Sequence, residues 1–176
     1  SLYHTPSEMR LAGGMERFQD KGWFDNDEIE GIFEGADGQV YVASTLNGIS
    51  EIDPVSGAIR SLFKLPDGVV LTDAFFEKDR WIWLSTTDGV WRYDLHGSGV
   101  QHIESLPDDR FSLSGNYVTC VFVDKTDGVW LGTKDMGINW SGLSQTNFRK
   151  HYMASGVPLD GCIVSGFAEE SPDKVW

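Results

Sequence analysis

Residues 118–133 read VTCVFVDKTDGVWLGT, two short apolar runs on either side of a polar segment. Its first six residues are rich in β-branched side chains, the next five (DKTDG) are turn formers, and VWLGT is a second apolar run. Short β-favouring runs bounded by Asp, Gly and Lys are typical of antiparallel strands joined by tight turns. No part of the sequence shows a long stretch of helical periodicity. The sequence therefore predicts an all-β protein.

The first thirteen residues of this stretch form a block that occurs four times without a gap. Successive copies begin 42, 47 and 46 residues apart. The apolar residues at the first, fourth, twelfth and thirteenth positions are Ile29, Ile32, Val40 and Tyr41; Leu71, Ala74, Ile82 and Trp83; Val118, Val121, Val129 and Trp130; and Val164, Phe167, Val175 and Trp176. A period of about 40 to 50 residues with four strands is typical of a propeller blade. We predict a partial β-propeller of about four blades, each a four-stranded antiparallel sheet.

Two further positions of the block indicate which strand lies innermost. The third position is small and the fifth is mostly large: the residues are Gly31, Asp73, Cys120 and Gly166 at the third, and Phe33, Phe75, Phe122 and Ala168 at the fifth. Alternate residues of a strand share a face, so a small side chain lies beside a large one. This arrangement suits strands that converge on a central axis. Gly48, Gly89 and Gly137 follow the first three blocks at the point where the chain must reverse, and are expected in turns.

The repeat resembles the two-component regulator propeller repeat. Residues 118–133 with Gly137 and Ile138 match best, and residues 29–49 match second. The copy at 71–90 has Asp79 and Arg80 in its turn, and the copy that starts at Val164 stops at its tryptophan. The resemblance implies the extracytoplasmic, periplasmic sensor region of a membrane-spanning histidine kinase, commonly a hybrid kinase of the inner membrane that regulates glycan use.

Proteins of that family carry propellers of seven blades, and seven blades would need nearly twice this length. We therefore interpret residues 1–176 as a fragment of one propeller array, with repeats that start near residues 29, 71, 118 and 164. Residues 1–28 are expected to be the tail of a preceding repeat. An open array exposes apolar faces that a ring would cover, so self-association is expected.

Composition limits the partners that the chain can bind. Its net charge of −13 argues against nucleic acid and anionic membrane surfaces, which select basic patches. There is no run of eighteen apolar residues, so this segment is not expected to insert into a membrane by itself. Two cysteines, Cys120 and Cys162, are too few for a disulfide framework, and Cys120 reads as a small buried residue.

Catalytic and metal-binding patterns are not found. The four histidines are scattered without a second ligand at metal-binding spacing, and the acidic stretch at residues 25–30 breaks the calcium-loop pattern. We therefore expect no catalytic residues, no metal and no cofactor in this chain. A propeller lyase or hydrolase stays an alternative, for which Asp73 and Glu30 are the available inner-strand polar residues. A secreted scaffold of the WD-repeat kind is a second alternative, although the repeat lacks its Gly-His and Trp-Asp pairs.

Aromatic residues outside the repeat skeleton are the candidates for ligand contact. Trp91 and Trp140 lie just past the turn glycines, with Arg92, Asn139 and Glu51 at neighbouring positions. Aromatic faces stack on sugar rings, and such polar neighbours could hydrogen-bond to hydroxyl groups. The alternative for both tryptophans, and for Trp23, is packing between adjacent blades.

The skeleton tryptophans Trp83, Trp130 and Trp176 are expected in the core. Trp130→Ala is accordingly expected to lower stability by roughly 3 to 5 kcal/mol, and Trp91→Ala by far less.

Overall fold

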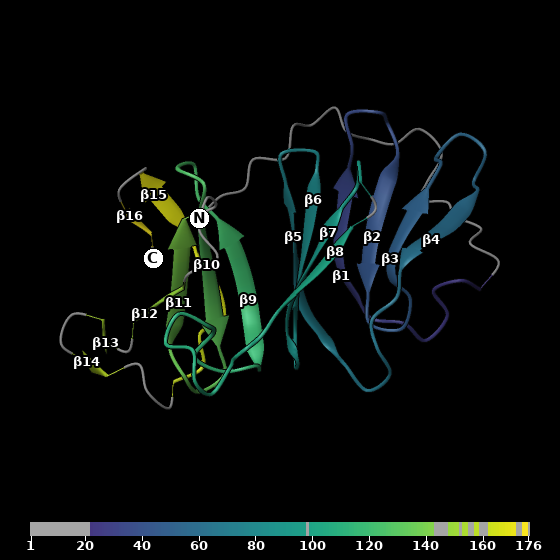
Figure 1. The fold of residues 1–176 in the computed structure, drawn as a ribbon. Helices are drawn as coiled ribbons and strands as arrows, with labels where there is room; N and C mark the ends of the chain where they lie inside the picture. Colours follow the sequence, from purple (N-terminus) through teal and green to yellow (C-terminus); the bar gives the residue numbers. More distant parts are fainter. Residues whose placement is uncertain are drawn as a thin grey trace, which may run out of the picture.

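The computed structural model describes residues 22–97, 99–142, 148–151, 153–154, 157–158, 162–171 and 174–175. Three four-stranded antiparallel sheets dominate it, and we call them blades 1, 2 and 3 (Figure 1). Blade 1 consists of β1 (Ile29–Glu34), β2 (Val40–Ser44), β3 (Gly48–Ile52) and β4 (Ile59–Phe63). Blade 2 consists of β5 (Leu71–Glu77), β6 (Trp81–Thr86), β7 (Gly89–Asp94) and β8 (Val100–Ile103). Blade 3 consists of β9 (Val118–Val123), β10 (Gly128–Thr133), β11 (Ile138–Gly142) and β12 (Arg149–His151).

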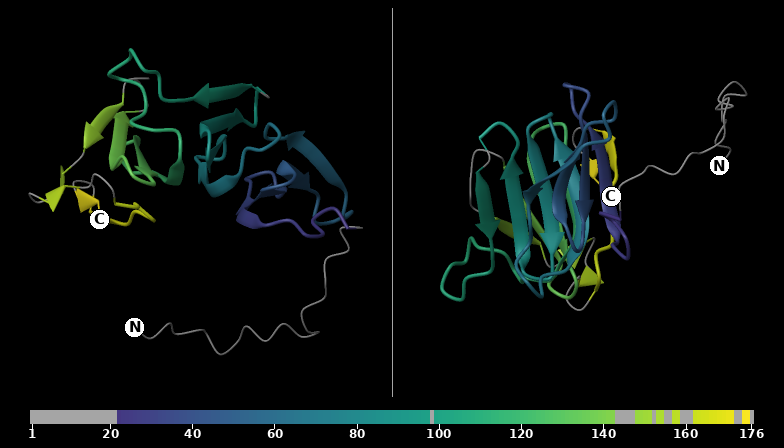
Figure 2. Two further views of the ribbon diagram at one scale, coloured as in Figure 1. Left: turned by 90° about the horizontal axis from the view of Figure 1, so that it is seen from below. Right: turned by 90° about the vertical axis from the view of Figure 1, so that its right-hand side faces the viewer.

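Two short hairpins follow blade 3. They are β13 (Met153–Ala154) with β14 (Val157–Pro158), and β15 (Glu169–Ser171) with β16 (Lys174–Val175). The blades follow one another along an arc, with β1, β5 and β9 in contact in turn (Figure 2). These sheets confirm the predicted all-β propeller architecture. Among the described residues there is no helix with the length and apolar character that a membrane span requires.

The ungapped block has a structural counterpart in the register of the first hairpin of each repeat. The sixth residue of the block pairs with the twelfth in every copy: the pairs are Glu34 with Val40, Phe76 with Ile82, Val123 with Val129, and Glu169 with Val175. The same register therefore extends to the fourth repeat. The fourth repeat differs from the pattern of its block in one respect: the block begins at Val164, but residues 162–168 carry no strand, and β15 begins only at Glu169.

A β-bulge interrupts the register at the second position of the block in blades 1, 2 and 3. A bulge turns one side chain out of the regular alternation. In blade 2 this side chain is Thr72, whose hydroxyl donates a hydrogen bond of 2.6 Å to the backbone carbonyl of Val118 in blade 3. In blade 3 it is Thr119, whose hydroxyl donates to the carbonyl of Val164 in the fourth repeat. The bulge thus links each of these blades to the next one near the axis.

The hydrophobic core is divided into layers between blades. One cluster of buried side chains lies between blades 1 and 2 and includes Tyr41, Ile82 and Leu84. A second lies between blades 2 and 3 and includes Trp83, Val129 and Leu131. Aromatic residues at the fifth and thirteenth positions face the next blade, as in the ring contact of 5.9 Å between Phe75 and Phe122.

The turn glycines have the conformation that their positions predict. Gly48, Gly89 and Gly137 all have positive φ, which favours glycine. A Cβ atom on Gly48 would also lie 2.2 Å from the carbonyl oxygen of Phe63. Strand reversal next to a neighbouring strand therefore excludes a side chain at this position.

Candidate functional site

Trp91 lies on β7 in the layer between blades 1 and 2. Its ring stacks on His102 with centroids 4.0 Å apart and an interplanar angle of 9°, and it contacts Phe63 of β4 at 5.6 Å. The indole nitrogen is shielded from solvent, and no described residue forms a hydrogen bond with it. One ring face of Trp91 is thus already covered by His102, which leaves less room for a sugar.

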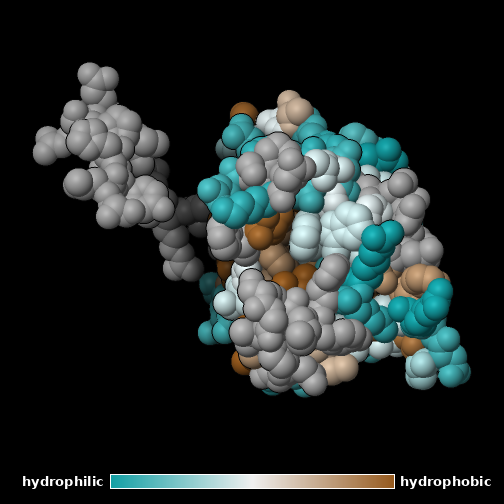
Figure 3. Space-filling view, turned by 90° about the vertical axis from the view of Figure 1, so that its left-hand side faces the viewer, coloured by the Kyte–Doolittle hydropathy of each residue, from teal (hydrophilic) through white to brown (hydrophobic). Residues whose placement is uncertain are grey.

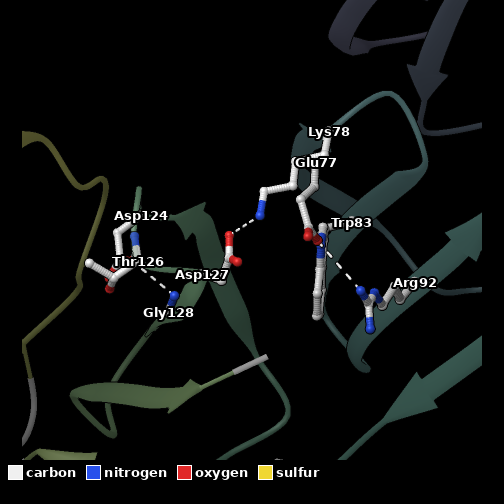
Figure 4. A network of polar contacts seen from close by, with 8 residues as sticks. All are labelled: Glu77, Lys78, Trp83, Arg92, Asp124, Thr126, Asp127 and Gly128. Atoms are coloured by element: carbon white, nitrogen blue, oxygen red, sulfur yellow. Dashed lines mark hydrogen bonds and ion pairs between the residues drawn. The ribbon is translucent and has the colours of Figure 1, made fainter. Parts of the chain in front are cut away.

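Arg92, the next residue of β7, points to the opposite face of the sheet. Its guanidinium lies 3.8 Å from the ring centre of Trp81 and 4.5 Å from that of Trp83, and it forms an ion pair of 3.5 Å with Glu77 (Figure 4). Glu77 also accepts a hydrogen bond of 2.7 Å from the indole nitrogen of Trp83. Burial lowers the pKa of Arg92, while the charge of Glu77 acts in the opposite direction. The positive charge of Arg92 therefore compensates the negative charge of the buried Glu77 carboxylate.

Asn139 is fully buried on β11, with 0% of its surface exposed. Its side-chain amide donates to the hydroxyl of Ser114 at 2.8 Å, and its oxygen accepts from the backbone nitrogen of Ser114 at 2.9 Å. These two bonds join β11 to the long connection between blades 2 and 3. As placed, Asn139 is shielded from a ligand in solution.

Trp140 follows Asn139 on β11 and faces the opposite side. Its ring is half-buried, lies 6.2 Å from that of Trp130, and has the guanidinium of Arg149 at 5.7 Å. Glu51 is paired across the strands with Arg60 at 2.7 Å, and the indole nitrogen of Trp23 donates to the hydroxyl of Ser50 at 3.1 Å.

The candidate residues do not form one site. Trp91 faces blade 1, whereas Trp140 lies on the face of blade 3 that contacts the fourth repeat through Trp130 and Phe167. Ligand contact by Trp91, Arg92, Asn139 and Trp140 stays a prediction, and Trp140 is the member whose surroundings best allow it.

The skeleton tryptophans differ in burial. Trp83 is buried, as predicted, with 2% of its surface exposed. Trp130 is only half-buried, because its ring lies on the forward face of blade 3 and contacts Phe167 at 6.2 Å. Trp176 lies outside the described residues.

Sequence reasoning missed an acidic residue at the seventh position of the block. Glu77 and Asp124 each accept a hydrogen bond from the indole nitrogen six residues later, that of Trp83 at 2.7 Å and that of Trp130 at 2.6 Å. Blade 1 has Gly35 at this position and Tyr41 in place of tryptophan, and there the hydroxyl of Tyr41 donates to Asp37. The sequence contains a pattern that predicts this pairing: an acidic residue occurs at the seventh position only in the copies that carry tryptophan at the thirteenth.

Asp124 is also the organising residue of its turn. Burial opposes its ionisation, but hydrogen bonds from Thr126, Trp130 and Gly128 hold the pKa of Asp124 below its usual value. Nearby, Lys78 of blade 2 forms an ion pair with Asp127 of blade 3 (Figure 4). These contacts stabilise the hairpins and the junction between blades.

The polar groups near the axis are few. Asp73 accepts hydrogen bonds from the backbone nitrogens of Ala74 at 2.9 Å and Val121 at 2.8 Å. Burial raises the pKa of Asp73, and burial together with the charges of Glu28 and Asp73 raises that of Glu30. Burial likewise raises the pKa of the Cys120 thiol to about 11, and Cys120 is buried as the sequence predicts. Across the described ranges, no three His, Cys, Asp or Glu side chains gather in a way that could hold a metal ion.

The raised pKa of Asp73 gives a pH dependence with a definite sign. Between pH 3.8, which is the ordinary pKa of an aspartate side chain, and the raised pKa, Asp73 is mostly protonated in the folded chain and mostly ionised in the unfolded chain. The free energy of unfolding therefore increases as the pH falls from 7 through the raised pKa, and this contribution levels off below the unfolded value. Asp73→Asn is expected to reduce this slope, measured as urea midpoints at several pH values. An unchanged slope in Asp73→Asn would contradict the assignment, and Glu30→Gln measures the second contribution.

An apolar hollow of about 370 Å³ lies on the face of blade 1 that points away from blade 2. Its lining residues are Phe24, Ile29, Ile32, Val40, Val42, Ile52 and Pro54. The opposite side of the molecule, beyond blade 3, also shows hydrophobic surface in a recess (Figure 3).

Parts of the chain are similar in sequence to known proteins. Residues 112–135 match the family described as two component regulator propeller. Histidine kinase P4 of Formosa agariphila is 33% identical over 75 residues, which are 42% of this chain and 5% of that protein. The chain therefore spans only a small part of the curated relative that it matches.

Solved structures share the fold. The extracellular domain of the putative hybrid two component system BT3049 from B. thetaiotaomicron superposes with a TM-score of 0.67 and 21% identity, over 84% of this chain and 21% of that one. Virginiamycin B lyase from Staphylococcus aureus superposes with a TM-score of 0.53 and 17% identity, over 73% of this chain and 42% of the lyase. The fold alone thus leaves catalysis open. The chain is a propeller segment that carries a two component regulator propeller repeat at residues 112–135.

Proposed function

We propose that this chain is part of the extracytoplasmic sensor region of a membrane-bound two-component histidine kinase, located in the periplasm and without catalysis of its own. The observation that carries the proposal is the match of residues 112–135, because they include the whole hairpin of β9 and β10. The likeness to a histidine kinase over 75 residues supports the same conclusion. The axis offers Asp73, whose two carboxylate oxygens both accept backbone hydrogen bonds, and this favours a structural role over a catalytic one.

The test of the kinase context is the reading frame around this segment. We expect further repeats, one apolar helix of about twenty residues and a histidine-kinase module in the same polypeptide. A frame that closes after a single propeller, with no membrane-spanning helix, would overturn this part of the proposal.

The ligand that we propose is a glycan or a related molecule, with Trp140 and Arg149 as its contacts. An aromatic ring offers a stacking surface, and a guanidinium pairs with a carboxylate in two parallel hydrogen bonds, so the pair suits an acidic sugar. Trp140 is half-buried and Arg149 is exposed, with the guanidinium 5.7 Å from the ring centre.

The binding test is a glycan array followed by titration calorimetry. Trp140→Ala and Arg149→Ala are each expected to weaken binding of an acidic oligosaccharide about tenfold or more. The matched control is Tyr117→Ala, since Tyr117 is an exposed aromatic residue with Lys134 at 4.5 Å and should leave binding unchanged. Thermal unfolding of each variant separates loss of contact from loss of fold. Equal weakening by Tyr117→Ala, or an array without binding, would refute the glycan assignment.

A further inference from the structure

The junction between blades 1 and 2 differs from the next two junctions at the second position of the block. Thr72 and Thr119 occupy this position in blades 2 and 3, and each hydroxyl donates to the first carbonyl of the following block. In blade 1 the residue is Glu30, and the corresponding carbonyl is that of Leu71. An ionised carboxylate only accepts hydrogen bonds, so Glu30 cannot make this bond while it carries its charge.

The backbone at this first junction is nevertheless arranged as it is between blades 2 and 3. The first residue of each block pairs with the same position of the second strand: Ile29 with Ser44, Leu71 with Thr86, and Val118 with Thr133. The stagger of the blades also agrees. A Cβ atom on Gly31 would lie 3.1 Å from that of Ala74, and Asp73, which corresponds to Gly31, bonds to the backbone of Val121, which corresponds to Ala74. The carbonyl of Leu71 therefore faces blade 1 as that of Val118 faces blade 2.

Glu30 lies among groups that favour its protonation. The charged groups that act on it are Glu28, just before β1, and Asp73 of β5, and both are acidic. The strand paired with this part of β1 is β2, which brings Ala43 and Ser44, and neither side chain ionises. Burial and then these two negative charges raise the pKa of Glu30. A proton on Glu30 removes the repulsion and also turns its carboxyl into a donor.

We propose that Glu30 is a proton-controlled link between blades 1 and 2, which donates a hydrogen bond to the carbonyl of Leu71 only when it is protonated. The glutamate side chain has more rotatable bonds than threonine, so its carboxyl can fold back to a carbonyl that a threonine hydroxyl reaches directly. The bonds from Thr72 and Thr119 do not depend on pH. Blade 1 therefore changes its attachment to blade 2 while the later blades stay joined. This proposal does not depend on the proposed sensor function.

The effect on stability has a definite sign. The contribution of Glu30 to the free energy of unfolding is complete below its ordinary pKa of 4.5 and is lost as the pH rises through the raised value. Asp73 contributes with the same sign, so the pH dependence of the native chain does not by itself separate the two groups. Substitutions at position 30 that leave Asp73 in place are therefore needed.

Two such substitutions separate the hydrogen bond from the charge. Glu30→Gln removes the charge and keeps an N–H donor, whereas Glu30→Met removes the charge, has a similar length and offers no donor. Urea titrations between pH 5 and pH 7.5 stay above the isoelectric point of about 4.5, where association is promoted. We expect the equilibrium constant for unfolding to be about fivefold larger in Glu30→Met than in Glu30→Gln at each pH, the effect of one hydrogen bond. The native chain should approach Glu30→Gln in stability at pH 5 and fall below it as the pH rises.

The carbonyl carbon of Leu71 reports the bond directly in NMR spectra. Its chemical shift in Glu30→Gln should match that of the native chain at pH 5, and its shift in Glu30→Met that of the native chain at pH 7.5. The carbonyl of Val118, which accepts from Thr72, is the matched control and should not change with pH. Circular dichroism verifies that both variants fold. Equal unfolding constants for the two variants, or a Leu71 carbonyl that does not respond to pH in the native chain, would overturn the proposal.

Discussion

Trp83→Ala lowers the free energy of unfolding by about 3 to 5 kcal/mol, the range for a large aromatic side chain removed from a core. Trp83 is 2% exposed and belongs to the cluster between blades 2 and 3. Its removal also deprives Arg92 of one of the two rings beneath its guanidinium. Urea unfolding followed by circular dichroism measures the effect.

The comparison with other tryptophans makes this result specific. Trp130 and Trp91 are both half-buried, so Trp130→Ala and Trp91→Ala should each reduce stability less than Trp83→Ala. This ranking replaces the sequence-based expectation that Trp130 is a core residue and that its loss far exceeds that of Trp91. Equal midpoints for Trp83→Ala and Trp91→Ala would contradict the burial described above.

Glu77→Ala is the second substitution with a large expected effect, a loss of about 3 to 5 kcal/mol. Glu77 is 5% exposed, and its ion pair with Arg92 has little contact with water. Without the carboxylate, Arg92 stays as an uncompensated charge in a shielded place, and the indole nitrogen of Trp83 loses its acceptor. Guanidinium chloride is unsuitable here because it screens charge, so urea is the denaturant of choice.

A double-mutant cycle tests the cause. Arg92→Met removes the charge and keeps an apolar chain of similar length over Trp81 and Trp83. The double variant of Glu77→Ala and Arg92→Met should be more stable than the sum of the two single losses predicts, because neither partner is left unpaired. Simple additivity would show that Glu77 acts through contacts other than Arg92.

The fold could be predicted from the sequence because the repeat has no gap. The paired positions of the first hairpin lie six residues apart, and that spacing is constant, so Glu169 pairs with Val175 as Val123 pairs with Val129. The strands β9 and β10 lie where VTCVFV and VWLGT predict them. Local pattern is sufficient for the hairpin whose two strands both lie within the block.

The candidate site was harder to predict because its contacts lie outside the thirteen-residue block. Asn139 reads as a polar residue beside a tryptophan, but its partner Ser114 lies 25 residues away in a connection without a repeat pattern. The stacking of Trp91 on His102 depends on the pairing of β7 with β8, which brings two residues outside the skeleton together. Neither contact involves a residue of the thirteen-residue block, so the repeat pattern does not predict either of them.

The threonine hydrogen bonds near the axis bear on how such a chain can change over time. In each, the donor is the side chain of Thr72 or Thr119, and the acceptor is a main-chain carbonyl of the next repeat. Every amino acid supplies that carbonyl, so the receiving repeat needs no matching side chain. A repeat that keeps its own threonine can be duplicated, lost or exchanged without a compensating substitution in its neighbour. Recombination between repeats therefore leaves this hydrogen bond intact, whereas the buried side chains between blades still have to match.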